Sequence, residues 1–241
     1  MHTIVLATQK GGSGKSTLAI GLARAAIDAG HTVRLIETDQ QGTLSNWQAR
    51  RSYAEPRVDP IYAAGDIADR LARLAEEGVT LAIVDTAGGV GASTSVAIGN
   101  ADLCLIPARP SVVDIEATAV TLAEVRRAAK PFAFVLNQTP IRGQRLTNAA
   151  TTLGDGALDI PDVVAQPFIV MRNDHQDALS AGLAVSEFAP SGKSADEIRG
   201  LWSWIEARLG IAATLAPDQL SDLPVATMPA VQPSAEALSF A

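Results

Sequence analysis

Cysteine, histidine and aromatic residues are scarce in this chain of 241 residues. The single cysteine, Cys104, lies in an apolar run, so neither a disulfide framework nor a cysteine-based metal site can form within one chain. The three histidines show no metal-ligand spacing. Aromatic residues make up 4% of a chain that is 47% hydrophobic, so the core is expected to consist mainly of Ala, Leu, Val and Ile. Such a core suits a parallel sheet that is covered by helices.

Positive charge is also in short supply. The net charge of −7 argues against a generally basic nucleic-acid binder, so any contact with DNA must come from a local patch. No apolar run approaches the length of a membrane span, and the apolar residues 4–7 leave no room for a signal peptide before them. The sequence therefore predicts a cytoplasmic protein without a membrane partner.

Lysine and arginine are absent from residues 211–241, where Ala, Pro and Ser predominate. Such a segment cannot bury enough apolar surface to fold by itself, so we expect a disordered tail. Residues 215–223 are the candidate for a partner-binding motif within it. Residues 1–210 have the length of one ordinary α/β domain with a substantial core.

The most informative stretch is QKGGSGKST at residues 9–17. An apolar run precedes it and apolar residues at helical spacing follow it, so the order is strand, glycine-rich loop, helix. Glycines leave the backbone N–H groups open to a polyphosphate, Lys15 brings a charge to the β- and γ-phosphates, and the Ser16 hydroxyl can ligate Mg²⁺. The sequence thus predicts a nucleotide-binding loop made by Gly11, Gly12, Ser13, Gly14, Lys15, Ser16 and Thr17.

This loop departs from the general P-loop pattern G-x-x-x-x-G-K-[ST], because Gln9 occupies the first glycine position. The string K-G-G-x-G-K-[ST], with a second lysine at Lys10, resembles the deviant Walker A loop of the ParA/MinD family of ATPases. The resemblance extends over residues 3–210 and implies ATP and Mg²⁺ as cofactors. It also implies that Lys10 crosses a dimer interface to reach the nucleotide of the partner subunit.

An acidic and amide-rich segment, ETDQQ, follows the second apolar strand. Side chains at the carboxyl end of a parallel strand face the ligand crevice, so Asp39 should approach the γ-phosphate. The alternative is that Asp39 caps a helix over residues 43–51. ParA proteins read D-x-D-P-Q here, and the resemblance implies that Asp39 positions or activates the attacking water. Gln41 also matches the family pattern, whereas Glu37 and Gln40 depart from it.

Two further strand ends carry candidate site residues. The segment LAIVD at residues 81–85 is typical of a Walker B strand, in which Asp85 holds Mg²⁺ directly or through water. Glycines at positions 88, 89 and 91 let the loop after it move, as a sensor of the γ-phosphate must. The strand 132–136 ends at Asn137, and the resemblance implies that this amide recognises the adenine edge. A turn-forming Asn is the alternative.

Alternating strand and helix patterns fill the rest of the domain and, with the resemblance, predict a doubly wound, mostly parallel α/β sheet of the deviant P-loop type. Residues 56–60 are expected to be irregular. Ser194 is expected to cap the last helix, with Glu197 at the capping-box spacing. The other expected strands are residues 32–36, 101–106 and 163–165, and the expected helices are residues 43–51, 65–77, 112–129, 147–153 and 195–209.

The resemblance implies a partition ATPase. Such a protein forms a homodimer over ATP, binds DNA without sequence preference on the nucleoid, and is released when a ParB-like or adaptor partner protein stimulates hydrolysis. Arg172, Lys193 and Arg199 lie where ParA relatives place their DNA contacts, although each is alternatively a solvated charge.

The alternative function is a ParA-like regulatory or scaffold protein that binds nucleotide and a protein partner, with little affinity for DNA. Nitrogenase iron protein has a similar loop, but it needs cluster-binding cysteines that are absent here. MinD proteins end in a basic amphipathic helix that binds membrane, and the tail lacks the charges for one.

Overall fold

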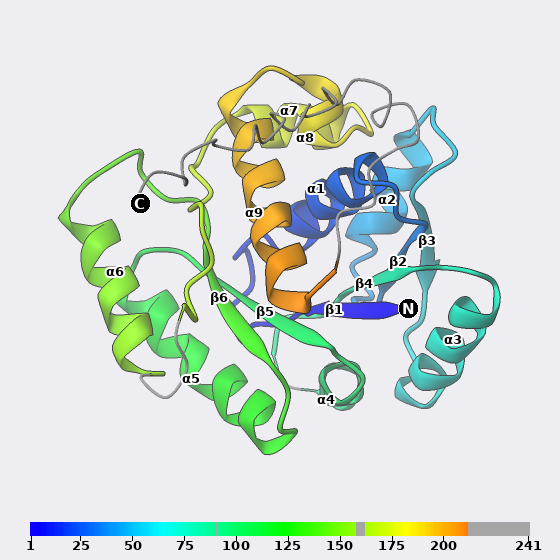
Figure 1. Ribbon diagram of the computed structural model, residues 1–241, viewed down its shortest axis with the longest axis horizontal. Coiled ribbons are helices and arrows are strands. Elements are labelled where there is room, and N and C mark those ends of the chain that lie inside the picture. Colours follow the sequence, from blue (N-terminus) through cyan, green and yellow to red (C-terminus); the bar gives the residue numbers. More distant parts are fainter. Residues whose placement is uncertain (90, 158–161, 212–241) are drawn as a thin grey trace, which may run out of the picture.

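Six parallel strands form one sheet in the order β3-β2-β4-β1-β5-β6 (Figure 1). The computed structural model describes residues 1–89, 91–157 and 162–211. Every neighbouring pair of strands in this sheet is parallel. The strands are β1 (His2–Leu6), β2 (Val33–Glu37), β3 (Arg57–Pro60), β4 (Leu81–Asp85), β5 (Leu103–Ala108) and β6 (Phe132–Leu136).

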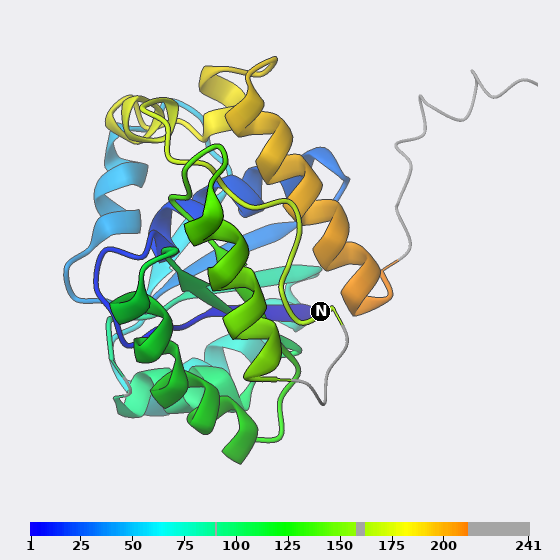
Figure 2. The same cartoon turned by 90° about the vertical axis from the view of Figure 1, so that its left-hand side faces the viewer.

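Helices cover both faces of the sheet. Figure 2 looks toward the β6 edge and shows α9 on one side of the sheet and α5 on the other. The first side carries α1 (Lys15–Asp28), α2 (Thr43–Arg50), α7 (Asp174–Ser180), α8 (Val185–Phe188) and α9 (Lys193–Leu209). The second carries α3 (Ala64–Glu76), α4 (Ala92–Gly99), α5 (Val112–Arg127) and α6 (Gln144–Asp155).

Strands β1, β4, β5 and β6 are mainly apolar because each one contributes to two cores. In β1, Ile4 and Leu6 point into the core beneath α1 and α9, whereas Val5 points into the core on the opposite face. Cys104 is fully buried in the second core, as expected for a strand residue. This burial on both faces is the reason that the sequence shows apolar runs in place of strict alternation.

The order of the strands creates a crevice at their carboxyl ends. The chain lays β2, β3 and β4 on one side of β1 and then crosses to the other side for β5 and β6. In open sheets of this kind, ligands bind where the direction of winding reverses. The register pairs Leu6 of β1 with Asp85 of β4, so the glycine-rich loop and the predicted Walker B acid leave the sheet side by side.

The predicted doubly wound, parallel α/β fold is confirmed, and the helices expected at residues 43–51, 65–77, 112–129 and 147–153 are present with small shifts of their ends. The expectation that residues 56–60 are irregular is wrong, because Arg57–Pro60 pair with β2 as the edge strand β3. Only one apolar side chain, Val58, is buried in β3. Its pairing depends on backbone contacts with β2, which leave no clear apolar pattern in the sequence.

Three smaller differences concern β5, residues 163–165 and α4. Strand β5 was expected to end at Ile106 but continues to Ala108, and it tolerates Pro107 because its ladder with β1 stops at Leu105. Residues 163–165 contribute one parallel bridge, between Val164 and Phe134, in place of the expected strand. Helix α4 was not expected from the sequence.

The predicted capping box at the start of α9 is wrong. The helix begins at Lys193 after the N-cap Gly192, and no side chain caps it. The Ser194 hydroxyl donates instead to Asp174 Oδ2 at 3.0 Å, and Glu197 pairs with Arg172. Both side chains therefore contact residues at or just before the start of α7, and neither caps the terminus of α9. The predicted tail lies outside the described residues, apart from Ile211.

Candidate functional site

The glycine-rich loop joins β1 to α1 at the carboxyl edge of the sheet. Gly12 and Gly14 have φ angles of 75° and 88°, in the region that side chains other than glycine rarely adopt. The loop lines an open cavity of about 520 Å³. Residues from three loops surround this cavity: Gln9, Gly11, Gly12, Gly14, Lys15, Ser16 and Thr17, then Asp39, Gln41 and Thr43, and finally Ala87 and Gly88.

Lys15 is the first residue of α1 and is only 8% exposed. Burial lowers the pKa of its ammonium group, and the nearby Asp85 and Asp39 carboxylates oppose that effect. The backbone N–H groups at the start of α1 and the partial positive charge of the helix terminus lie at the same point. A phosphate bound here would neutralise a buried cation, which is the condition that favours anion binding at a helix N-terminus.

Ser16 and Asp85 meet beneath the loop. The Ser16 hydroxyl donates to Asp85 Oδ2 at 2.6 Å, and Asp85 Oδ1 is buried without a hydrogen-bond partner in the described part of the chain. Burial raises the pKa of Asp85 to about 7, while the Ser16 hydrogen bond and the Lys15 charge lower it. A hydroxyl beside an incompletely satisfied carboxylate fits the oxygen ligands that Mg²⁺ prefers.

Asp39 lies in the loop between β2 and α2 and lines the same cavity as Lys15. Its Oδ1 accepts the backbone N–H of Gln41 at 3.0 Å, and its own carbonyl accepts from Gly42. The alternative interpretation of Asp39 as the cap of α2 is wrong, because the N-cap residue is Gly42 and the N–H groups of the first turn are accepted by another side chain. The structure thus places Asp39 beside the predicted phosphate site with its second oxygen available.

That other side chain is Glu37, which the sequence comparison had set aside as a departure from the family pattern. Glu37 is fully buried, and its carboxylate accepts the N–H groups of Leu44 at 2.6 Å and Ser45 at 3.2 Å. A helix that starts after a glycine has no capping side chain of its own. In α2 the Glu37 carboxylate, at the end of the preceding strand, takes that place.

Asn137 lies under the glycine-rich loop and is 4% exposed. Its Nδ2 donates to the Ser13 carbonyl at 2.7 Å, and its Oδ1 accepts from the backbone of Gln138. Gln138, which sequence reasoning did not single out, donates from Nε2 to the Gly12 carbonyl at 3.0 Å. Both amides therefore support the loop from the end of β6. The predicted contact between Asn137 and an adenine base stays a prediction.

A second, partly apolar cavity of about 110 Å³ adjoins the loop. It is lined on one side by Gly14, Thr17 and Asn137. On the other side it is lined by residues in and just before α7, including Met171 and His175. Gly14 and Thr17 line both cavities, so the two adjoin the same part of the loop. A ligand with a polyphosphate and a flat ring matches this combination of a polar and a partly apolar cavity.

The remaining predicted residues are Lys10, which lies in the loop itself, and the three candidate DNA contacts, of which Arg172 also lines the second cavity. Lys10 is partly exposed in the loop and makes no hydrogen bond or ion pair with any described residue. Arg172 is held by both oxygens of Glu197 at 2.7 and 2.8 Å, and Arg199 pairs with Asp196 at 2.6 Å. Lys193 is exposed at the start of α9. Two of the three predicted DNA contacts are thus neutralised by carboxylates.

No helix in the described ranges is both long and apolar enough to cross a membrane.

The sequence and the fold also match known proteins. The family model described as the CobQ/CobB/MinD/ParA nucleotide binding domain matches residues 4–184.

The chain is 28% identical to the protein virC1 of Rhizobium rhizogenes over 178 residues, covering 69% of this chain and 76% of the relative. It is 27% identical to the protein ParA of Rhizobium radiobacter over 172 residues, covering 66% and 76% respectively. The structure is similar to that of the septum site-determining protein MinD from Pyrococcus horikoshii, complexed with Mg-ADP, with a TM-score of 0.70. That match covers 89% of this chain and 99% of the other at 15% identity.

Proposed function

Because the chain belongs to the CobQ/CobB/MinD/ParA family of nucleotide-binding domains, we propose that it is a partition or positioning ATPase. The observation that carries this proposal is that one cavity brings together the glycine-rich loop, Lys15, Ser16 and Asp39, with Asp85 directly beneath. Phosphoryl transfer needs these elements, because its catalysis consists mainly of positioning and charge stabilisation. The relatives named ParA and virC1 support the partition role.

Each residue then has a distinct task. The loop N–H groups and Lys15 hold the phosphates, and Asp39 orients the attacking water toward the γ-phosphate. Ser16 and Asp85 are the residues that would hold Mg²⁺, which supplies charge neutralisation to the phosphates. The similar MinD structure is a complex with Mg-ADP, which supports the use of Mg²⁺ with the nucleotide. In this proposal the partly apolar cavity beside Gly14 receives the adenine base, and Asn137, which lines that cavity, recognises the edge of the base.

The proposal includes a homodimer that encloses two ATP molecules. Lys10 has no partner in the described part of its own chain, which leaves its ammonium group available for a nucleotide in a second subunit. Two exposed apolar side chains support an interface near the base cavity: Met171, which lines that cavity and is 66% exposed, and Ile141, which lines a neighbouring surface pocket together with Met171 and is 77% exposed. An exposed apolar patch of this kind marks interaction sites.

In this proposal ATP turnover is slow until a ParB-like or adaptor partner stimulates it, and the ATP-bound dimer binds DNA without sequence preference. The regulatory or scaffold alternative is kept because of one observation. Arg172 and Arg199 are already paired with carboxylates, so the predicted DNA face offers less positive charge than the sequence indicated. Whether DNA binds only in the presence of ATP distinguishes the two functions.

The test uses the purified chain with Mg²⁺, comparing ATP and ADP. We expect slow ATP hydrolysis by the wild-type chain and none by Lys15→Ala. We also expect the molecular mass of the wild-type protein to double when a slowly hydrolysed ATP analogue is added. Light scattering measures the mass, and release of phosphate measures turnover. A chain that binds ATP without hydrolysis or change of mass would contradict the proposal.

A further inference from the structure

We propose that Glu37 is a positioning residue for ATP hydrolysis, because its buried carboxylate holds the loop that carries Asp39 against the N-terminus of α2. This inference rests on the proposed function, in which Asp39 acts on the attacking water. Glu37 itself does not line the nucleotide cavity. Its effect on hydrolysis therefore passes through the loop.

The Glu37 carboxylate is fully buried, and its hydrogen bonds to described residues lie at the start of α2. It accepts from Leu44 N at 2.6 Å, from Ser45 N at 3.2 Å and from the Ser45 hydroxyl. These contacts satisfy N–H groups that have no partner within the helix. They also place a negative charge at the positive end of the helix dipole. Charge-assisted hydrogen bonds of this kind are among the stronger ones in proteins.

These contacts tie together the two ends of a short loop. Thr38 is fixed to β4 because both its N–H and its hydroxyl donate to the Asp85 carbonyl, at 3.0 and 3.2 Å. The loop of residues 38–42 then reaches α2, and Glu37 connects the strand end directly to the helix start. Asp39 and Gln41, the two cavity-lining residues of the loop, lie between these fixed points. Their positions therefore depend on the separation that Glu37 sets.

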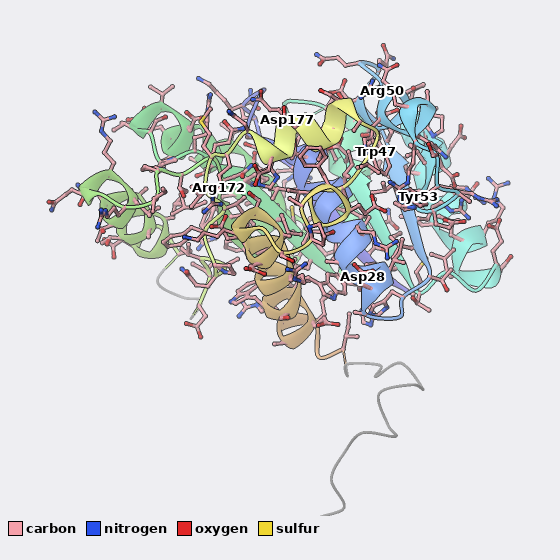
Figure 3. All side chains as sticks on the ribbon, turned by 90° about the horizontal axis from the view of Figure 1, so that it is seen from above. Asp28, Trp47, Arg50, Tyr53, Arg172 and Asp177 are labelled. Atoms are coloured by element: carbon pink, nitrogen blue, oxygen red, sulfur yellow. The ribbon has the colours of Figure 1, made fainter. Side chains whose placement is uncertain are left out.

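The other end of α2 is held independently. Figure 3 shows Trp47 and Arg50 on α2 beside α7, which carries Asp177. The Trp47 indole N–H donates to the Leu183 carbonyl at 3.1 Å, and the Arg50 side chain donates to the Leu179 carbonyl. Arg51, which follows the helix, forms a nearly fully buried ion pair with Glu187. Because α2 is anchored at this end, Glu37 ties the Asp39 loop to a fixed support.

The experiment compares Glu37→Gln with Trp47→Phe. Glu37→Gln keeps the length of the side chain and one acceptor but loses the charge and one carboxylate oxygen. Trp47→Phe removes a hydrogen bond at the opposite end of the same helix and leaves the Asp39 loop untouched. Steady-state and single-turnover ATP hydrolysis, affinity for a fluorescent ATP analogue, and urea unfolding are measured for both variants with Mg²⁺.

We expect Glu37→Gln to lower kcat by about tenfold while ATP affinity stays within about threefold, because a small misplacement of a catalytic group lowers rate more than binding. Trp47→Phe should lower stability with kcat nearly unchanged. Equal effects of the two variants on kcat, or no effect of Glu37→Gln, would show that Glu37 only caps the helix. If Glu37→Gln does not fold, Ser45→Ala removes one donor to the same carboxylate, and an unchanged kcat in that variant overturns the inference.

Asp39→Ala, measured in parallel, separates this inference from the proposed function. If Asp39→Ala hydrolyses ATP at the wild-type rate, the role proposed for Asp39 is wrong, and the positioning role proposed for Glu37 is wrong as well. If Asp39→Ala is inactive and Glu37→Gln is fully active, the proposed function stands and only the inference about Glu37 is overturned.

Discussion

The Ser16 hydroxyl donates a 2.6 Å hydrogen bond to Asp85, which joins the first turn of α1 to the end of β4. The carboxylate that accepts this hydrogen bond is almost fully buried, since Asp85 is 1% exposed. Water cannot compensate its charge there, so the ionised form of Asp85 depends on the Lys15 charge and the Ser16 hydrogen bond, and a bound cation would stabilise it further. The site is thus arranged for a ligand that brings positive charge.

Removing the Asp85 charge should stabilise the protein in the absence of Mg²⁺ and nucleotide. Burial raises the pKa of Asp85 from 3.8 to about 7, so the native state binds this proton more tightly than the unfolded state does. Its contribution to stability is complete below the unfolded pKa and is lost as pH rises through about 7. Asp85→Asn should therefore be more stable than wild type at pH 8, by about 2–4 kcal/mol.

Urea unfolding in EDTA at pH 5 and pH 8 checks this prediction. The gain in Asp85→Asn should shrink at pH 5, where the wild-type carboxyl is protonated. A gain of equal size at both pH values would show that the effect comes from packing and not from ionisation.

Asp39→Ala should bind ATP normally but hydrolyse it about 10²–10⁴ times more slowly, the usual range for losing a group that positions or activates water. The phosphate contacts from the loop and Lys15 are unchanged in this variant. Retention of a fluorescent ATP analogue and release of phosphate are measured with Mg²⁺. Wild-type turnover would contradict the assignment.

Lys10→Ala should leave ATP affinity nearly unchanged but prevent dimerisation. The Lys10 side chain has no partner among the described residues of its own chain, and across an interface it would neutralise charge in the manner of an arginine finger. Light scattering with a slowly hydrolysed ATP analogue measures the dimer. Lys130→Ala, which removes a lysine just beyond α5, is the matched control. A Lys10→Ala variant that still dimerises would refute the role in trans.

The sequence predicts the nucleotide loop well because its chemistry is local. Gly12, Gly14, Lys15 and Ser16 belong to a contiguous strand-loop-helix segment, so their spacing alone predicts where they lie in the fold. The position of Asp85 at a strand end was predictable for a similar reason, since an apolar strand that ends in an acid has a recognisable pattern.

Contacts between distant segments were less predictable. Ser194 and Glu197 have capping-box spacing, yet Asp174 and Arg172 attract them away from the helix end. Glu37 looked like a deviation because its partners, Leu44 and Ser45, become visible only when the loop is folded. Such long-range side-chain contacts compete with local patterns, and the sequence alone does not show which of the two prevails.

Gly14→Ala should weaken ATP binding by at least about tenfold. A Cβ atom at this position would lie 2.3 Å from Asn137 Nδ2, and the φ angle of 88° is unfavourable for alanine. The loop or the Asn137 amide must then move, which breaks the hydrogen bond to Ser13. Gly65→Ala in α3 is the control, because a Cβ there meets nothing within 4 Å. Titration with a fluorescent ATP analogue and urea unfolding separate lost binding from lost stability.

DNA binding, if the partition proposal holds, should require ATP and fall steeply with salt. Dimerisation doubles the number of phosphates reached, and log affinity falls by about 0.9 per phosphate contact for each decade of salt. Because Arg172 is paired with Glu197, Arg172→Glu alone would place two carboxylates together and destabilise the fold. Lys193, which is exposed and has no partner among the described residues, gives the cleaner test.

Lys193→Glu should therefore lower the affinity for unrelated DNA duplexes. It should also make that affinity less dependent on salt concentration, with dimerisation unaffected. Binding is measured by fluorescence anisotropy with ATP and with ADP at several salt concentrations. Equal, weak binding in both nucleotide states would favour the scaffold alternative, because a partition switch must release DNA when ATP is hydrolysed.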